Sequence, residues 1–159
     1  MSVRELVQAA LLGALEMAVF TALSSVLYVE AVTLTIVCVA VCMPKKIAVL
    51  SSVCFCVLNM LLVQAITPWS LMYLMIYPTY SLIVGSVHIR TKKKAALITG
   101  ILSFMTGQLL QIPWMLFSKI LAAGYLLMGL QTSLIQGAIS AALAWFLFEP
   151  VCRILKRVN

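Results

Sequence analysis

The stretch TPWSLMYLMIYPTYSL, residues 67–82, is an apolar run that carries amphipathic aromatic rings at helical spacing. The rings follow one another at intervals of four, four and three residues, on one side of a helix: Trp69, Tyr73, Tyr77 and Tyr80. Thr67 and Pro68 have the character of an N-cap and a first-turn proline. Pro78, and Pro113 in a later run, each predict a kinked helix. The stretch therefore predicts an apolar helix with an aromatic face.

The chain as a whole is too apolar to form a soluble domain. Its 159 residues are 64% hydrophobic and only 9% charged, and the mean hydropathy is +1.15. So few polar residues cannot cover the surface of a globular protein. We therefore expect an all-α integral membrane protein, a single domain over residues 1–159 with six transmembrane helices. Their expected bounds are about 5–28, 30–43, 46–66, 68–88, 94–118 and 121–150.

Positive charges recur at alternate connections between these runs. They stand at the N-terminus, at every second connection and at the C-terminus: Arg4, Lys45, Lys46, Arg90, Lys92, Lys93, Lys94, Arg153, Lys156 and Arg157. The other connections carry only Lys119. Because cytoplasmic loops are enriched in Lys and Arg, the pattern predicts six crossings with both termini in the cytoplasm. The run at 30–43 is short, and it is assigned as a crossing because basic groups would otherwise lie on both sides. The net charge of +7 then reflects topology and contact with anionic lipid, not nucleic-acid binding.

Residues able to perform catalysis or bind a metal are few and poorly placed. Cys38 and Cys42 are one helical turn apart, but a metal site needs further ligands, and the only histidine, His88, ends a different apolar run. The five cysteines fit the role of small apolar packing residues. No nucleophile beside a base and no Gly-rich phosphate-binding loop is evident. We expect a protein without enzymatic activity, metal or cofactor.

Polar side chains inside the predicted helices are concentrated in the half of the membrane away from the cytoplasm. Because an unpaired amide is costly in hydrocarbon, this asymmetry predicts a polar cavity that opens to the outside. Rings beside neutral amides suit a planar, polar heterocycle. The candidate ligand-binding residues in these positions are Asn59, Trp69, Tyr73, Tyr77, Gln108, Gln111, Trp114, Thr132 and Gln136. Two other interpretations stay open: an aromatic belt for Trp69 and Trp114, and hydrogen bonds between helices for the amides.

The first apolar run carries an acidic residue and two ladders of small residues. Glu16 is a further candidate ligand-binding residue, since a carboxylate inside a membrane is costly without a function or a partner; a bond to a neighbouring helix is the alternative. Small residues at four-residue spacing let helices approach closely. The ladders are Ala9 with Gly13, and Ala10 with Ala14 and Ala18. If Glu16 faces the bundle, the alanine ladder faces out, because the two lie about 200° apart around the helix.

The charge of the ligand is constrained by the residues near the expected cavity. Glu30 lies in the connection after Tyr28, where it either closes the mouth of the cavity or is a solvated loop charge. Lys119 at the rim is the only basic residue expected nearby, which argues against a strongly anionic ligand. Aromatic walls and carboxylates favour a neutral or cationic ring.

The whole chain resembles the S components of energy-coupling factor (ECF) vitamin transporters in a combination of features. These are six helices, cytoplasmic termini, a short second helix, an outward-opening polar cavity on the helices at 68–88, 94–118 and 121–150, and a small-residue ladder on the helix at 5–28. The resemblance implies a binding subunit of the bacterial plasma membrane that captures a small water-soluble vitamin or precursor. A planar heterocycle such as thiamine, hydroxymethylpyrimidine or pyridoxine fits the expected cavity.

The resemblance also implies partners. An S component works with a transmembrane coupling subunit and two cytoplasmic ATPases that supply the energy. Its small-residue ladder docks against the coupling subunit, and the corresponding residues here are Ala9, Ala10, Gly13, Ala14 and Ala18. The alternative is a membrane scaffold without a ligand, similar to the cell-shape protein MreD, in which the polar residues pack against one another or against a partner.

Overall fold

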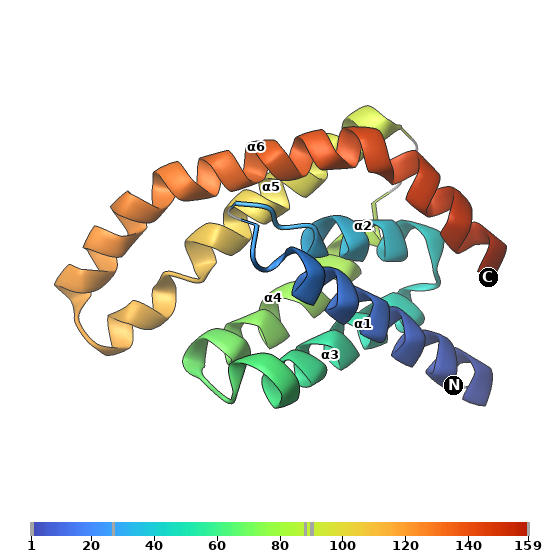
Figure 1. The fold of residues 1–159 in the computed structure, drawn as a ribbon, viewed down its shortest axis with the longest axis horizontal. Helices are drawn as coiled ribbons and strands as arrows, with labels where there is room; N and C mark the ends of the chain where they lie inside the picture. The colour runs from blue at the N-terminus through green and yellow to red at the C-terminus, as the bar shows by residue number, and fades with distance from the viewer. Residues whose placement is uncertain (1, 27, 88, 90, 159) are drawn as a thin grey trace.

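The structure is a computed structural model that describes residues 2–26, 28–87, 89 and 91–158, and over these residues the chain is all-helical (Figure 1). The helices in chain order are α1 (Val3–Leu23), α2 (Val32–Cys42), α3 (Lys45–Asn59), α4 (Pro68–Val84), α5 (Lys92–Leu109) and α6 (Lys119–Val158). A π-helical turn, η1 (Met60–Gln64), continues α3, and a 3-10 turn, η2 (Ile112–Leu116), lies between α5 and α6. The expected all-α class is confirmed for the described residues.

Within the described ranges, four segments are long and apolar enough to cross a membrane. They are Val3–Leu23, Lys45–Gln64, Lys92–Leu116 and Ala123–Arg157. The chain therefore has the helices of a membrane protein. Two helices are shorter than these, because α4 has 17 residues and α2 has 11. The last helix is longer than the run at 121–150 predicts, since α6 has 40 residues.

The short helix α2 lies at the centre of the bundle, in contact with α1, α3, α4, α5 and α6. Nine of its 11 residues are buried, including Ile36, Val37 and Cys38 with no exposed surface. A helix that is apolar all round is expected to be enclosed by protein, which accounts for a run without a polar face. At a rise of 1.5 Å per residue α2 is only about 16 Å long, far less than a hydrocarbon core of roughly 30 Å. Because other helices enclose α2, it does not need to match the thickness of the hydrocarbon core.

The fifth apolar run is not one continuous helix, contrary to the prediction for residues 94–118. The α-helix α5 ends at Leu109, and the chain continues as η2 with Pro113 in its first turn. Proline has no N–H to donate and restricts the residue before it, so the α-helix ends before Pro113 and does not kink at it. In contrast, α4 continues through Pro78, after an N-cap at Thr67 and a first-turn Pro68 as predicted.

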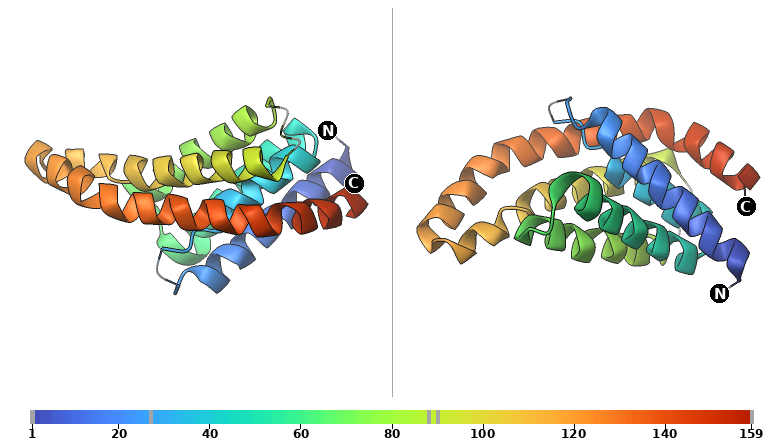
Figure 2. Two further views of the ribbon diagram at one scale, coloured as in Figure 1. Left: turned by 90° about the horizontal axis from the view of Figure 1, so that it is seen from above. Right: turned by 60° about the horizontal axis from the view of Figure 1, so that its bottom comes forward.

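The pair α5 and α6 packs closely through glycines that the sequence reasoning did not single out. A Cβ atom on Gly100 would lie 3.0 Å from the carbonyl oxygen of Gly137, and one on Gly137 would lie 2.8 Å from the carbonyl oxygen of Gly100. The two backbones therefore touch where neither residue has a side chain. Figure 2 shows the two helices side by side, with their connected end extending past the other helices.

The two ladders of α1 lie on different faces, as the position of Glu16 predicts. Ala9 and Gly13 are buried, and a Cβ on Gly13 would lie only 2.7 Å from the Cβ of Cys54 on α3. The alanine ladder is exposed on another face of the helix: Ala10, Ala14 and Ala18. Only this second ladder is free to contact another protein, so the docking prediction for Ala9 and Gly13 does not fit the fold.

Candidate ligand-binding cavity

A cavity of about 490 Å³ lies at the end of the bundle where α1 ends, α4 begins and α5 ends. Its polar lining comes from the α1–α2 connection, η1, α4, α5 and α6: Ser24, Tyr28, Glu30, Gln64, Tyr73, Tyr77, Thr106 and Gln136. Its rim includes Val26, Tyr28 and Val63, which are 48%, 39% and 49% exposed, so the cavity opens to the surface. This end is opposite the starts of α3 and α5, where Lys45, Lys46 and Lys92 lie.

The carboxylate of Glu30 accepts hydrogen bonds from four side chains around the cavity. Its Oε1 accepts hydrogen bonds from the hydroxyls of Thr33 and Tyr77, the latter at 3.1 Å. Its Oε2 accepts from the hydroxyl of Ser103 and from Nε2 of Gln136, the latter at 3.2 Å. These four donors belong to α2, α4, α5 and α6. One side chain from a loop therefore joins four helices at the cavity.

The backbone of Glu30 is held in the same way. The hydroxyl of Ser140 on α6 donates to the carbonyl oxygen of Glu30 at 3.0 Å, and it lies 2.9 Å from the hydroxyl of Ser103. Tyr28, two residues earlier, has φ 63°, a left-handed conformation that is uncommon outside glycine. Glu30 is thus held at both its side chain and its main chain.

The carboxyl group of Glu30 has hydrogen-bond donors but no counter-ion among the described residues. In the described part of the chain, no Lys or Arg side chain interacts with this carboxyl group. Burial raises the pKa of Glu30, and the hydrogen bonds from Ser103, Thr33, Gln136 and Tyr77 lower it in part. All four donors suit an ionised carboxylate, which only accepts. A buried charge without an opposite charge is costly, so a cation in the cavity would be stabilised by Glu30.

Two stacked tyrosine rings lie at the cavity, and Tyr73 is partly exposed whereas Tyr77 is buried. Tyr73 and Tyr77 on α4 stack with ring centroids 5.2 Å apart and an interplanar angle of 12°. Phe55 on α3 packs edge-on against Tyr77, with ring centroids 5.6 Å apart. Such aromatic faces attract cations and planar rings. The aromatic side predicted for α4 therefore does line a cavity at two of its four positions.

The structure brings some of the predicted residues into the cavity and leaves others outside it. Tyr73, Tyr77 and Gln136 line it, together with Gln64 and Glu30. Of the two interpretations weighed for Glu30, the solvated loop charge is wrong, because its side chain turns inward to four donors. The sequence signal for this role is an isolated acidic residue just before a short run that has no polar face.

Trp69 and Trp114 lie outside the cavity lining in an aromatic cluster that connects α4, η2 and α6. Their ring centroids are 5.2 Å apart, and Tyr125 stacks on Trp114 at 4.3 Å with an interplanar angle of 13°. Phe117 stacks on Trp69 at 6.2 Å. These rings contact one another, and none of them lines the cavity. The cluster joins the start of α4 to η2 and to the start of α6.

Glu16 and Asn59 are buried away from the cavity. Glu16 is fully buried at the α1–α3 contact, where Oε1 accepts a hydrogen bond of 3.2 Å from the hydroxyl of Ser51. Its Oε2 has no hydrogen-bond partner among the described residues. Asn59, the last residue of α3, is 1% exposed, and its Oδ1 likewise lacks a partner in the described part of the chain. Neither residue lines the cavity.

The remaining three predicted residues have local or interhelical hydrogen bonds. Gln108 donates from Nε2 to the hydroxyl of Ser133 at 3.0 Å and so bridges α5 and α6. Gln111 donates to the carbonyl of Gly107 at 3.5 Å, and Thr132 donates to the carbonyl of Gly129 at 2.9 Å. For Gln108 the structure supports the alternative of a hydrogen bond between helices. None of the three lines the cavity.

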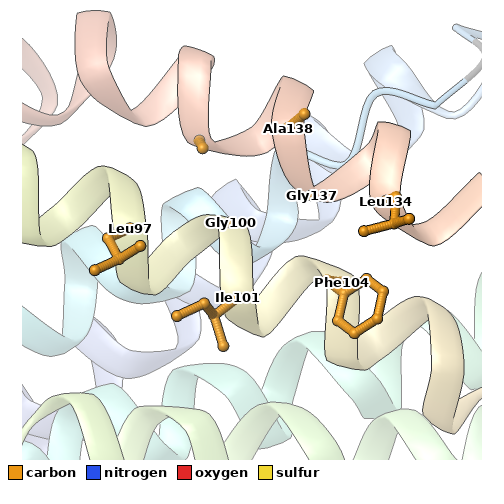
Figure 3. Close-up of a pocket in the computed structure, with 8 residues that line it drawn as sticks. Leu97, Gly100, Ile101, Phe104, Leu134, Gly137 and Ala138 are labelled. Atoms are coloured by element: carbon orange, nitrogen blue, oxygen red, sulfur yellow. The ribbon is translucent and has the colours of Figure 1, made fainter.

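A second hollow, the α5–α6 groove, has a different chemistry (Figure 3). It has a volume of about 270 Å³, and Leu97, Ile101, Phe104 and Leu134 surround the contact of Gly100 with Gly137. Its lining residues are all apolar. A polar ligand would find no hydrogen-bond partner there among the side chains, so the cavity at Glu30 is the better candidate site.

Neither the arrangement of possible metal ligands in the described part of the chain nor comparison with known proteins indicates a further site. The described residues contain no group of three or more His, Cys, Asp and Glu side chains that is placed to hold a metal ion. The five cysteines are free thiols, four of them buried. Comparison of the chain with known protein families, curated proteins and solved structures finds no match.

Proposed function

We propose that this protein is the substrate-binding S component of an ECF-type importer and that it captures a small, planar, cationic nutrient from outside the cell. One observation carries the proposal: an open cavity in a membrane-type bundle holds a carboxylate, that of Glu30, without a counter-ion beside stacked rings of Tyr73 and Tyr77. Its volume of about 490 Å³ lies within the usual range of roughly 300–1,000 Å³ for small-molecule sites.

The orientation follows from the charges at the two ends. The exposed basic residues stand at the starts of α1, α3 and α5 and at the end of α6: Arg4, Lys45, Lys46, Lys92, Lys93, Lys94, Arg153, Lys156 and Arg157. The positive-inside rule puts this end in the cytoplasm, and the cavity then opens outside. In this topology the chain crosses six times, with α4 as the fourth crossing. The second crossing is made through the interior by α2, which does not need to match the bilayer because protein encloses it.

The ligand class follows from the charge and shape of the lining. A cation gains the counter-charge of Glu30 and contact with the tyrosine faces, whereas an anion is repelled by the same carboxylate. Gln64 and Gln136 supply amide groups for orientation. Thiamine and related ring cations fit this description better than folate, which is an anion.

The energy source would be separate subunits. The chain has no Gly-rich phosphate-binding loop, so ATP hydrolysis belongs to two cytoplasmic ATPases joined through a coupling subunit. The exposed ladder Ala10, Ala14 and Ala18 is the docking face that we assign to the coupling subunit. Ala9 and Gly13 are not part of this face, since they pack against α3.

The experiment that tests the function is identification of the bound nutrient. The protein is purified in mild detergent, retained small molecules are identified by mass spectrometry, and a panel of cationic, neutral and anionic vitamins is tested by thermal shift. We expect a cationic ring compound to be retained and to raise the melting temperature, and Tyr73→Leu to reduce that shift. Gln108→Leu is the matched control, because Gln108 lies outside the cavity, and it should leave the ligand-induced shift unchanged. A panel without any stabilising compound would favour the scaffold function.

A further inference from the structure

A third hollow, the α3–α4 groove, lies at the basic end of the bundle, opposite the ligand cavity. It has a volume of about 360 Å³ and is lined by Lys45, Lys46, Val49, Leu50, Val53 and Leu82. Five of these residues follow α3 along one face, with the two lysines at its first turn and Val53 two turns further on. From Lys45 to Val53 the groove runs about 12 Å at 1.5 Å per residue. It is therefore an apolar channel with positive charge at one end only.

The lysine at the end of the groove is held in position. Nζ of Lys45 donates a hydrogen bond of 3.1 Å to the hydroxyl of Ser86, beyond the end of α4. Its side chain passes close to Gly85, where a Cβ would lie 3.2 Å from the Cγ of Lys45. A larger residue at 85 would push the lysine away. The side chain of Lys45 is thus held between α3 and the end of α4.

The positive charge of Lys45 and Lys46 is offset only weakly within the described part of the chain. Neither Lys45 nor Lys46 forms a hydrogen bond to an acidic side chain there. Glu5 on α1 interacts weakly with Lys46, and its Oε2 also accepts a hydrogen bond of 2.7 Å from the backbone N–H of Ser2. Pro44, the N-cap of α3, provides no side-chain cap, so the first turn of the helix also favours an anion.

We propose that the α3–α4 groove binds one anionic phospholipid of the cytoplasmic leaflet. The phosphate of the lipid lies at Lys45 and Lys46, and the first part of one acyl chain lies against Val49, Leu50 and Val53. A phosphate group alone would use the lysines but would leave the apolar wall without a partner. A neutral lipid would use the wall but would not compensate the charge. An anionic lipid satisfies both, and this inference does not depend on the nutrient bound at the other end.

The test compares lipid retention by native mass spectrometry after equilibration of the full chain in mixed micelles of phosphatidylglycerol and phosphatidylcholine. We expect one phosphatidylglycerol to remain bound preferentially. The double variant Lys45→Gln/Lys46→Gln should lose affinity for it by roughly fivefold per lysine. Lys93→Gln/Lys94→Gln is the matched control with the same change in net charge, since these exposed lysines do not line the groove, and it should retain the lipid. Equal loss in both double variants would overturn the proposal, because it would indicate diffuse attraction.

Two further measurements test whether an acyl chain lies in the groove. Val53→Trp fills the groove and should reduce lipid retention while both lysines are present, with thermal unfolding used to check that the variant is folded. Millimolar inorganic phosphate should not displace the lipid. Displacement by phosphate, or unchanged retention in a folded Val53→Trp protein, would overturn the assignment of the apolar wall.

Discussion

Glu16 and Glu30 are both carboxylates inside the bundle, but their surroundings differ in two ways. Glu16 is sealed at the α1–α3 contact with one donor, Ser51, and one oxygen without a partner in the described chain. Glu30 has four donors from four helices and borders an open cavity. Access and hydrogen bonding therefore distinguish a carboxylate sealed between two helices from one that borders an open cavity, which is where the proposed function places the ligand.

The comparison also shows why position along a helix is a poor guide to function. Glu16 stands in the middle of an apolar helix, which is the position where a carboxylate most strongly suggests function. Glu30 stands in a connection, where a charge is usually solvated. The tertiary structure reverses this order, because the connection folds inward while the α1 face carrying Glu16 meets α3 through Gly13.

The largest expected effect comes from removing each carboxylate in turn. Glu30→Gln should weaken binding of a cationic ligand about 30-fold or more, equal to about 2 kcal/mol, because the counter-charge is lost. Glu16→Gln makes the same chemical change outside the cavity and should leave the affinity unchanged. Isothermal titration calorimetry on both variants, with thermal unfolding as a check of folding, measures the difference. If the two variants weaken binding equally, Glu30 is not the specific counter-charge for the ligand.

The next effect concerns packing around Glu16. A Cβ added in Gly13→Ala would lie 2.7 Å from the Cβ of Cys54 and 2.8 Å from the carbonyl oxygen of Ser51. Separation of α1 from α3 should lower the free energy of unfolding by about 1–3 kcal/mol, as seen for overpacked cores. Denaturation in detergent measures this change.

The neighbouring substitution Ala14→Leu is the matched control on the exposed face of α1. It should change stability by less than about 0.5 kcal/mol and spare ligand binding. Under the proposed docking, it should nevertheless reduce uptake in cells that contain the coupling subunit. Normal uptake with Ala14→Leu would remove the docking face, and a stable Gly13→Ala protein would show that the α1–α3 contact is looser than the structure indicates.

The smallest effect is a dependence of affinity on pH. The pKa of Glu30 is raised above the ordinary value of 4.5 by burial, so the carboxylate becomes protonated at a pH above that value as the solution is acidified. Affinity for a ligand with a permanent positive charge should therefore fall as pH is lowered, and the loss should approach at most the loss expected for Glu30→Gln once the carboxyl group is protonated. Binding assays from pH 8 to pH 4 on the wild type and on Glu16→Gln should give the same midpoint. If the pH midpoint of binding differs between the wild type and Glu16→Gln, the titrating group is Glu16 and not Glu30.

Several features of the fold follow from local sequence alone. Composition predicts apolar helices, Thr67 and Pro68 predict the start of α4, and the opposite placement of Glu16 and Ala14 predicts which face of α1 is exposed. These predictions succeed because helical periodicity and caps depend on residues within one or two turns.

The composition of the site depends on contacts that periodicity does not describe. Trp69 and Tyr73 are one turn apart, yet Trp69 packs in the cluster with Trp114 while Tyr73 lines the cavity. Gln108 pairs with Ser133 of another helix, and Gln136 pairs with Glu30, which is 106 residues away in the chain. The relative rotation of helices decides between these outcomes.

By itself the sequence determined that this chain is a helical membrane-type protein with a basic end and an end rich in polar and aromatic groups. Only the tertiary structure decided that α2 is enclosed and that the connection before it brings Glu30 to donors on four helices. The physical reason is that apolar character and periodicity are properties of each helix, whereas the cost of a buried charge is set by the groups that other helices place around it.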